Sequence, residues 1–436
     1  MSLFLANHFH HRLSAMQSIT SKYIYILFVF TLVFGIILHG PIGFEYIDEI
    51  AALGLIVLFF TYMFKTPNWE INKAFLITLS IFIFYLVYSF AIKSNAPKAI
   101  FTDFIIQLKP YVAFFCIYQM SPKFSSNQKR VLNQLCIISW VLLMILGIGD
   151  IFVYKLIIKT MGHPTKFAAA ITAVSLTYLY TSDFKWKNKL FFLLMLSVGL
   201  ISGKAKFYGF FVLATIVTFY FSDIKNIKLS FRNVMVILIM IAGIALVAWQ
   251  KIMFYFLSSL TGGEENDYLA RFVLYGTSFL IFADYFPFGS GLGSFATHAS
   301  RVVYSNTYSK YNIDSIWGLS KSYDTFIADT YYPSLAQFGV VGVILFFSFW
   351  IYILKKAFNY MRLTQDTLVI TLVIITTGFL LIENIADATQ TSNRGFFIMM
   401  FLGVILGEQK AKIEQLTTDT GEQSSEQNPT VENQPV

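Results

Sequence analysis

The feature that most constrains this chain is the recurrence of apolar segments long enough to cross a bilayer. A membrane-spanning helix needs about 17–25 predominantly apolar residues, and such runs follow one another through most of the 436 residues. Hydrophobic residues make up 56% of the chain and charged residues only 13%, against about 25% charged in a typical soluble protein. The sequence therefore predicts an all-α integral membrane protein and disfavours a cytoplasmic globular enzyme.

We predict about twelve membrane-spanning helices. Their expected ranges are 23–39, 47–64, 74–92, 100–120, 131–150, 167–181, 190–201, 207–221, 233–250, 333–354, 367–382 and 395–407. Helices 1–9 then occupy residues 23–250 and helices 10–12 residues 333–407, and a large loop at 251–332 separates the two sets. A short tail, 1–22, precedes them. Residues 408–436, rich in Glu, Gln and Thr, are expected to form a disordered tail.

The distribution of Lys and Arg predicts the orientation, because cytoplasmic loops carry an excess of these residues. With a cytoplasmic N-terminus, 18 of them lie in inside segments and 8 in the short outside connections, with 5 more in the large loop. Both termini are thus expected in the cytoplasm, and the large loop on the periplasmic side of a bacterial inner membrane. The net charge of +8 mostly reflects this topology, so nucleic acid is not an expected partner.

The fourth predicted span contains polar residues that lipid would not tolerate. Asp103 and Gln107 are four residues apart and share a helix face. Lys109 comes six residues after Asp103 and therefore lies about 9 Å deeper than Asp103. Charges at this depth usually line a cavity or pair with one another. Two interpretations stay open: a structural Asp–Lys pair, or a ligand-facing role.

Two short connections on the outer side also carry charges. The segment 190–221 has apolar arms of 12 and 15 residues around Lys204 and Lys206, which are shorter than the ~20 residues of a full span. These lysines should lie near the headgroups or in a cavity just below them, although snorkelling to lipid phosphates explains them equally well. By the same argument, the charged residues of the loop 383–394 lie close to the outer mouth.

The large loop holds 10 of the 25 tyrosines. Tyrosine suits sugar rings and also a membrane-interface belt. A helix is expected to open at Asn266 or Asp267, and Arg271 would lie in its first turn. Since a cation gains nothing from the helix dipole there, Arg271 should have an anionic partner elsewhere.

A glycine-rich run follows in the same loop. Gly289, Gly291 and Gly293 superficially match a dinucleotide-binding loop, but no strand precedes them and no βαβ unit surrounds them. Two interpretations remain: a tight turn, or a turn whose backbone amides hold phosphate.

At this point the sequence resembles the bacterial O-antigen polymerase and O-antigen ligase superfamily of membrane enzymes. The four blocks that carry the resemblance are MGHPTKFA (161–168), ISGKAK (201–206), Arg271 with FPFGSGLG (286–293), and Asp329 with Tyr332 and LAQFGVVG (335–342). In the first block, His163 is a structural or ligand-facing polar residue at the entry to a middle helix. The resemblance implies a GT-C-like fold with a large, partly helical periplasmic loop between spans 9 and 10.

The resemblance also implies a reaction: transfer of a glycan from a polyprenyl diphosphate to a hydroxyl group of another sugar. Cations would stabilise the diphosphate leaving group, and Lys204, Lys206, Arg271 and Arg301 are the candidates. Ligases usually place a His before the returning helix, where this chain has Asp329, so a polymerase is favoured. The lysines at 204 and 206, where many relatives have Arg, weaken a bidentate phosphate clamp at that turn.

The acceptor hydroxyl needs a base, for which Asp329 is the first candidate and Asp324 the second. Asp329 serves equally well as a helix N-cap. No metal site and no cofactor are expected. The expected partners are the lipid-linked oligosaccharide and membrane lipids, and a chain-length regulator is left open. The alternatives are ligation of finished chains to lipid A–core and, in another class, a flippase or secondary transporter.

Overall fold

The computed structural model describes residues 17–43, 46–66, 71–220 and 266–426, and these residues form helices and no strand. Six helices are long and apolar enough to cross a membrane: Gln17–Ile37, Ile47–Lys65, Lys73–Ile92, Pro97–Met120, Ser126–Phe152 and Tyr332–Thr364. The fold is therefore that of a helical, multi-pass membrane protein.

The helices follow the predicted segments closely. In chain order they are η1 (Thr31–Ile37, the end of the first helix), α2 (His39–Ile42), α3 (Ile47–Lys65), α4 (Lys73–Ile92), α5 (Pro97–Met120), α6 (Ser126–Phe152), α7 (Leu156–Met161), α8 (Pro164–Thr181), α9 (Trp186–Ser197), η2 (Val198–Ser202), α10 (Ala205–Tyr220), α12 (Asn266–Asp284), α13 (His298–Val302), α14 (Asn306–Lys310), η4 (Tyr332–Phe338), α15 (Gly339–Thr364), α16 (Thr367–Glu383), η5 (Thr389–Thr391) and α17 (Asn393–Glu426). Eleven of the twelve predicted segments coincide with helices, and the ninth, 233–250, lies outside the described residues. The twelve-span topology stays a prediction, because several of these helices are shorter than a full span.

The C-terminal helix corrects one prediction. α17 continues to Glu426, so residues 408–426 are helical where the sequence predicted a disordered tail. Glu, Gln, Lys and Ala are good helix formers, and the start of this stretch is anchored to the bundle. Glu408 accepts hydrogen bonds from Lys129 at 2.6 Å and from Tyr180. Polar composition alone did not reveal that neighbouring helices hold this segment.

The core of the bundle is formed by α5 and α17, which pack along each other, with α8 and α16 beside α17. Small residues let the two backbones approach closely. A Cβ added at Gly403 of α17 would lie 2.9 Å from the carbonyl oxygen of Phe114 of α5. The outer helices α3, α4 and α6 instead expose apolar side chains such as Val57, Val87 and Ile145, as expected for surfaces that face lipid.

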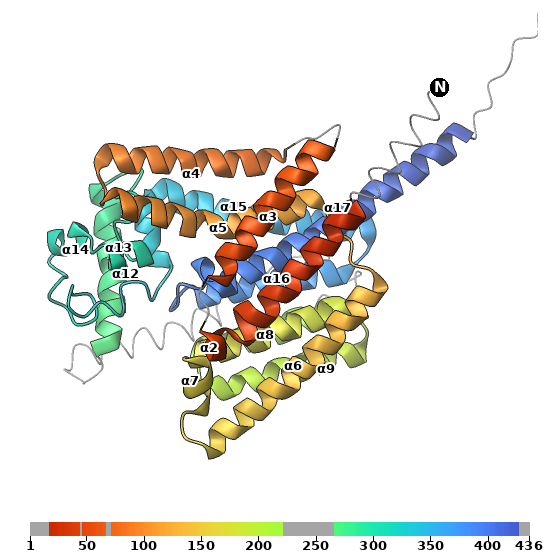
Figure 1. Ribbon diagram of the computed structural model, residues 1–436, viewed down its shortest axis with the longest axis horizontal. Helices are drawn as coiled ribbons and strands as arrows, with labels where there is room; N and C mark the ends of the chain where they lie inside the picture. The colour runs from red at the N-terminus through yellow and green to blue at the C-terminus, as the bar shows by residue number, and fades with distance from the viewer. Residues whose placement is uncertain (1–16, 44–45, 67–70, 221–265, 427–436) are drawn as a thin grey trace, which may run out of the picture.

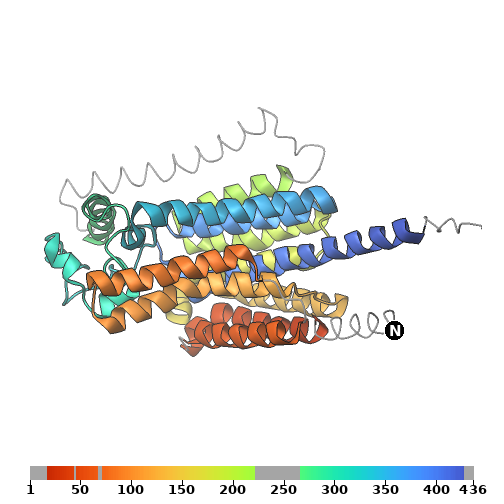
Figure 2. The same cartoon turned by 90° about the horizontal axis from the view of Figure 1, so that it is seen from above.

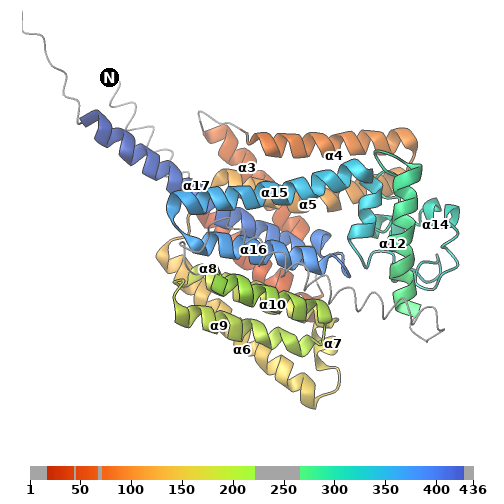
Figure 3. The same ribbon diagram turned by 180° about the vertical axis from the view of Figure 1, so that it is seen from behind.

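A second, smaller unit lies at one end of the bundle. We call residues 266–331 the cap; it contains α12, α13 and α14, and α12 lies across the long axes of the bundle helices (Figures 1 and 3). The cap has its own hydrophobic core, which includes Leu274, Phe295, Tyr308 and Ile327. The described end of α17 projects from the opposite end of the bundle, as the view from above shows (Figure 2).

The turn between α4 and α5 anchors the cap. Ser94 Oγ donates to the carbonyl oxygen of Leu292 at 2.8 Å. Asn95 Nδ2 donates to the carbonyl oxygens of Gly293 at 2.6 Å and Val303 at 3.0 Å. These contacts fix the cap over the outer ends of α4 and α5 and thereby define the space in which charged residues of the cap and bundle meet.

Candidate functional site

Charged side chains from several segments gather where the cap meets the bundle. We call this set the outer charge cluster: Lys206, Arg271, Asp329, Glu383, Asp387 and Arg394. Lys206 lies in the first turn of α10, Glu383 ends α16, and Arg394 lies in the first turn of α17. Because Lys206, Glu383 and Arg394 lie at helix ends, the helices bring together charges that are up to 188 positions apart in the chain.

Lys206 is the centre of the bundle part of the cluster. Its Nζ lies 2.6 Å from Glu383 Oε2 and 3.7 Å from Asp387 Oδ2, and its side chain is only 13% exposed. Lys206 and the charged loop 383–394 are thus in direct contact with each other, and their position at the outer mouth stays a prediction. The ion pairs also show that Lys206 does not rely on lipid phosphates for a counter-charge.

Arg394 and Asp387 form a two-pronged ion pair. Arg394 Nη1 and Nη2 donate to the two carboxylate oxygens of Asp387 at 3.0 and 2.8 Å, the geometry in which guanidinium and carboxylate bind most specifically. Burial alone would raise the pKa of Asp387, but the positive charges of Arg394 and Lys206 outweigh it and hold the pKa below its ordinary value. Asp387 is therefore an anion that accepts a proton only weakly, which makes it a poor base.

The cap contributes Arg271 and Asp329. Arg271 Nε donates to Asp329 Oδ2 at 2.7 Å, and Nη2 donates to the same oxygen. The prediction that Arg271 has an anionic partner from elsewhere in the chain is confirmed. The interpretation of Asp329 as a helix N-cap is wrong, because η4 starts at Tyr332 and has Tyr331 before it.

The environment of Asp329 differs from that of Asp387. Burial raises the pKa of Asp329, and the negative charge of Asp387 raises it further, while Arg271 and Lys206 act in the opposite direction. The pKa values of the two carboxylates therefore lie apart: Asp387 stays ionised at low pH, and Asp329 accepts a proton more readily. Such separation is typical of acid–base sites.

Two of the predicted polar residues, His163 and Lys204, lie beside the cluster. His163 caps the N-terminus of α8, where its ring accepts a hydrogen bond from the amide of Thr165. Lys204 follows Gly203, whose φ of +66° makes the turn between η2 and α10. The positive charge of Lys204 acts on His163, which places this turn beside the start of α8.

The structure corrects the predicted pairing of Asp103 with Lys109. Lys109 Nζ instead contacts Asp48 and lies 2.7 Å from Glu49 Oε1, both in the first turn of α3. Asp103 accepts a hydrogen bond from the backbone amide of Gly293 at 2.8 Å. On one helix, side chains six residues apart point in different directions, so each residue binds a different neighbour.

The glycine-rich run is a tight turn, and its amides are not available to phosphate. The amides of Gly289, Ser290, Gly291 and Gly293 donate to Tyr285, Ala336, Gln337 and Asp103, respectively. A Cβ at Gly289 would lie 2.3 Å from the carbonyl oxygen of Ala336. The glycines therefore allow the cap to meet η4 at backbone distance, and the phosphate-binding interpretation is wrong.

Arg301 and Asp324 lie outside the outer charge cluster. Arg301 lies in the last turn of α13 and forms no ion pair within the described part of the chain. The charge of Asp324 acts on the hydroxyl group of Tyr304, elsewhere in the cap. Sequence spacing gave no means of separating these two residues from Arg271 and Asp329.

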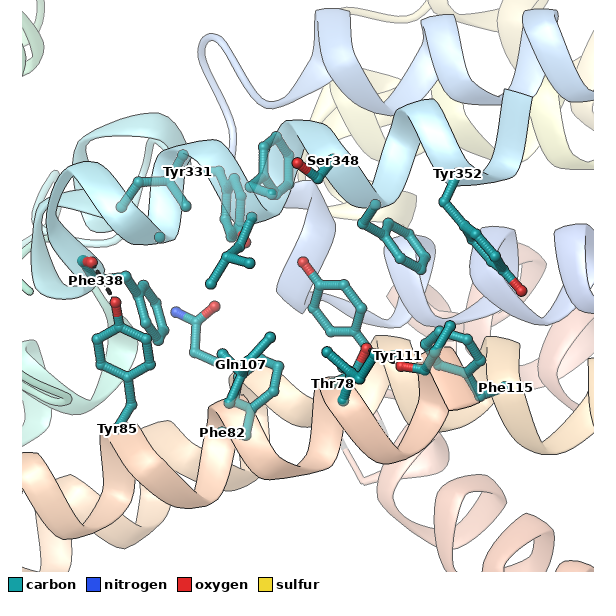
Figure 4. A pocket seen from close by; sticks show the side chains of 18 residues that line it. Thr78, Phe82, Tyr85, Gln107, Tyr111, Phe115, Tyr331, Phe338, Ser348 and Tyr352 are labelled. Atoms are coloured by element: carbon teal, nitrogen blue, oxygen red, sulfur yellow. Dashed lines mark hydrogen bonds between the residues drawn. The ribbon is translucent and has the colours of Figure 1, made fainter. Parts of the chain in front are cut away.

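A separate aromatic cavity of about 220 Å³ has Tyr331, two residues after Asp329, in its lining (Figure 4). It is bounded by α4 and α5 on one side and by η4 and α15 on the other. Tyr111, Tyr331 and Phe338 are among the side chains that line it. Ile77 of α4 and Ser348 of α15, also in the lining, are exposed, so the cavity opens sideways between these helices.

The comparisons leave the resemblance as a hypothesis. The sequence matches no protein-family model, and no curated protein matches it. The class that the fold defines is a helical membrane protein with a cap at one end, and its candidate site is the outer charge cluster beneath that cap.

Proposed function

We propose that this protein polymerises polyprenyl-diphosphate-linked oligosaccharide repeat units of O-antigen, capsule or exopolysaccharide at the outer face of a bacterial inner membrane. The proposal includes the twelve-span, GT-C-like topology with both termini in the cytoplasm. The observation that carries it is the pairing of Arg271 with Asp329 beside Lys206, Asp387 and Arg394. A cationic site that also holds a readily protonated carboxylate suits diphosphate departure and hydroxyl attack.

Arg271 and its neighbours bind the diphosphate in this proposal. The cluster pairs three cations with three carboxylates, and Lys204 lies two residues before Lys206. Nε and Nη2 of Arg271 donate hydrogen bonds to Asp329. No described residue accepts from Nη1, which is thus available for a phosphate oxygen. Preorganised cations of this kind stabilise a departing diphosphate.

The reaction is a glycosyl transfer. The acceptor hydroxyl oxygen attacks the anomeric carbon of the donor sugar, the bond from that carbon to the diphosphate oxygen breaks, and polyprenyl diphosphate leaves. Asp329 takes the proton from the hydroxyl group, which its raised pKa favours. The ion pair with Arg271 holds the Asp329 carboxylate in place before the reaction.

The aromatic cavity supports a lipid-linked donor. Its exposed lining residues Ile77 and Ser348 lie on helices with apolar outer faces, so an isoprenoid chain can enter here from the bilayer. Tyr331, in the cavity wall, is two residues from Asp329. The cavity is therefore connected through the chain to the outer charge cluster by one short segment.

Deletion of the gene tests the proposal. Loss of a polymerase leaves lipid A–core that carries one repeat unit, which appears as a single shifted band on a polysaccharide gel. Bare core with chains retained on the carrier would instead identify a ligase. Purified protein that moves lipid-linked sugar across liposomes without lengthening it would identify a transporter.

A further inference from the structure

The cap exposes a group of aromatic rings that the proposed reaction does not use. We propose that Trp317, Tyr323 and Phe326 form a platform on which sugar rings of the glycan stack as the chain enters or leaves the site. This inference rests on the proposed function and adds a binding site for the carbohydrate itself, distinct from the cationic site for the diphosphate.

The platform is continuous with the outer charge cluster. The guanidinium carbon of Arg271 lies 5.3 Å from the centre of the Phe326 ring. The Phe326 ring is 5.4 Å from that of Trp317, which stacks on Tyr323 at 4.6 Å with an interplanar angle of 29°. The rings thus lead in one series from Arg271 outward over the cap.

The outer rings are accessible. Trp317 is 40% exposed and Tyr323 is 43% exposed, whereas Phe326 is 9% exposed beneath them. An aromatic ring offers an apolar face with a polar group at its edge, which matches a sugar ring with its C–H face and its rim of hydroxyl groups. The exposed Ser322 and Lys321 beside Tyr323 add hydrogen-bond donors at the edge of the platform.

The backbone holds the platform rigid. Gly318 has a φ of +86°, and a Cβ there would lie 2.2 Å from Cδ2 of Phe326. The amide of Phe326 donates to the carbonyl oxygen of Gly318 at 3.0 Å, and that of Tyr323 donates to Ser320. Only glycine allows the chain next to Trp317 to press against Phe326, so the rings are ordered before a ligand arrives.

The choice of a glycan over a lipid surface follows from the surroundings. Tyr323 lies in the polar loop SKSYDT (320–325), and the series of rings ends on the cation–carboxylate pair Arg271–Asp329. A bilayer anchor needs neither a polar rim nor contact with a charged site. Insertion of these rings into the headgroup region is the alternative that the experiment addresses.

The experiment uses the full-length protein in nanodiscs and a soluble probe. The probe is the free oligosaccharide released by mild acid from the lipid-linked pool of the producing cells, and binding is measured by saturation-transfer NMR. We expect Trp317→Ala and Tyr323→Ala to weaken binding about tenfold, a loss of the size that aromatic contacts give, while Trp317→Phe retains most of it. Trp186→Ala is the matched control, since Trp186 is 62% exposed at the start of α9.

The outcomes separate the two proposals. No binding by the wild-type protein, equal binding by all variants, or quenching of Trp317 fluorescence by brominated lipids in a variant with the other tryptophans replaced by Phe would overturn the platform. Glycan binding that depends on Trp317 in a protein without polymerase activity would support the platform and reject the proposed function. Polymerase activity with unaltered glycan binding in the alanine variants would reject the platform alone.

Discussion

The protein contains two groups of buried charges that differ in balance. Lys109 in α5 faces two carboxylates of α3, Asp48 and Glu49, and its side chain is 5% exposed. The outer charge cluster has three cations and three carboxylates, which come from both the cap and the bundle. The first group is closed, since its single cation already has two anions. In the second, no described residue accepts from Nη1 of Arg271, so only the second keeps a cationic donor for a ligand.

This difference teaches that depth in the membrane does not by itself mark a functional charge. A lysine in an apolar helix is a functional candidate by default, yet Lys109 is satisfied by the start of a neighbouring helix. Arg271, in a cap helix, is less buried, with 27% of its side chain exposed, and it lies beside groups of both signs. The predictions below separate a role in stability from a role in activity.

The largest expected effect is on stability, at Lys109. Lys109→Met leaves the carboxylate of Asp48, only 3% exposed, without its cation, and removing one partner of a buried ion pair typically costs about 3–5 kcal/mol. Thermal unfolding in detergent should show this loss. The double variant Asp48→Asn/Lys109→Met should recover part of it, and polymer made per folded molecule should not change. Reduced activity in a variant of normal stability would place Lys109 in the functional site.

Arg271 should show the opposite behaviour. Arg271→Ala removes a donor to the leaving group, and losing such a donor typically lowers the rate about 10²–10³-fold. Polymer formation in membranes should therefore be abolished while protein abundance stays normal. Arg271→Lys should restore less than its charge suggests, because Lys cannot bind bidentately.

Arg301 provides the matched control for Arg271. It is a cap arginine outside the cluster, so Arg301→Ala should leave polymer formation close to normal. Normal polymer from Arg271→Ala, or equal losses from the two arginine variants, would contradict the role assigned to Arg271.

The anchoring of the cap should have a smaller effect. Gly289 has a φ of +80°, and its Cβ would strike the carbonyl oxygen of Ala336, so Gly289→Ala should cost about 1–3 kcal/mol in strain. Limited proteolysis should then cleave the cap faster. Gly276→Ala is the control, because a Cβ there meets nothing within 4 Å. Equal protease sensitivity of the two variants would argue against the backbone contact as the anchor.

The smallest expected effect concerns pH. The raised pKa of Asp329 means that it is protonated at a higher pH than an ordinary aspartate, and a protonated carboxyl group cannot accept the hydroxyl proton. Polymerisation should therefore fall as the pH drops through this raised pKa and recover above it. In Asp329→Asn, the residual rate should no longer follow this titration. An unchanged acid limb would assign the titration to another group.

Sequence reasoning located the helices well but not the tertiary contacts of their charges. Apolar runs report where helices form, because burial in lipid requires them. Packing decides which face of α5 meets which neighbouring helix, and the sequence does not show this. The sequence therefore suggested Asp103, rather than Asp48, as a partner for Lys109. Two acids at the start of an apolar run were the available signal for that contact.

The candidate site was predicted in part. The resemblance singled out Lys206, Arg271 and Asp329, and the structure brings these three together. Span length also placed the loop 383–394 at the outer mouth. Sequence reasoning missed the stacking of Trp317 on Tyr323, because a cap loop without periodicity gives no indication of which aromatic residues meet. The partners of the Ser290 and Gly291 amides were equally hidden, since they lie in η4, 46 residues further along the chain.

The backbone junction at Gly289 and Gly339 restricts sequence changes more strongly than the rest of the cap does. A Cβ at Gly339 would lie 2.3 Å from the carbonyl oxygen of Pro287, so the cap is fastened by main-chain atoms on both sides. Because main-chain atoms hold the cap in place, this attachment depends little on which side chains occupy the other positions of the cap. Under the proposed function, the outer loops of the cap can therefore diversify toward new sugars while the fastening stays intact, and exchanging residues 298–328 between polymerases of this kind should transfer glycan preference as a module.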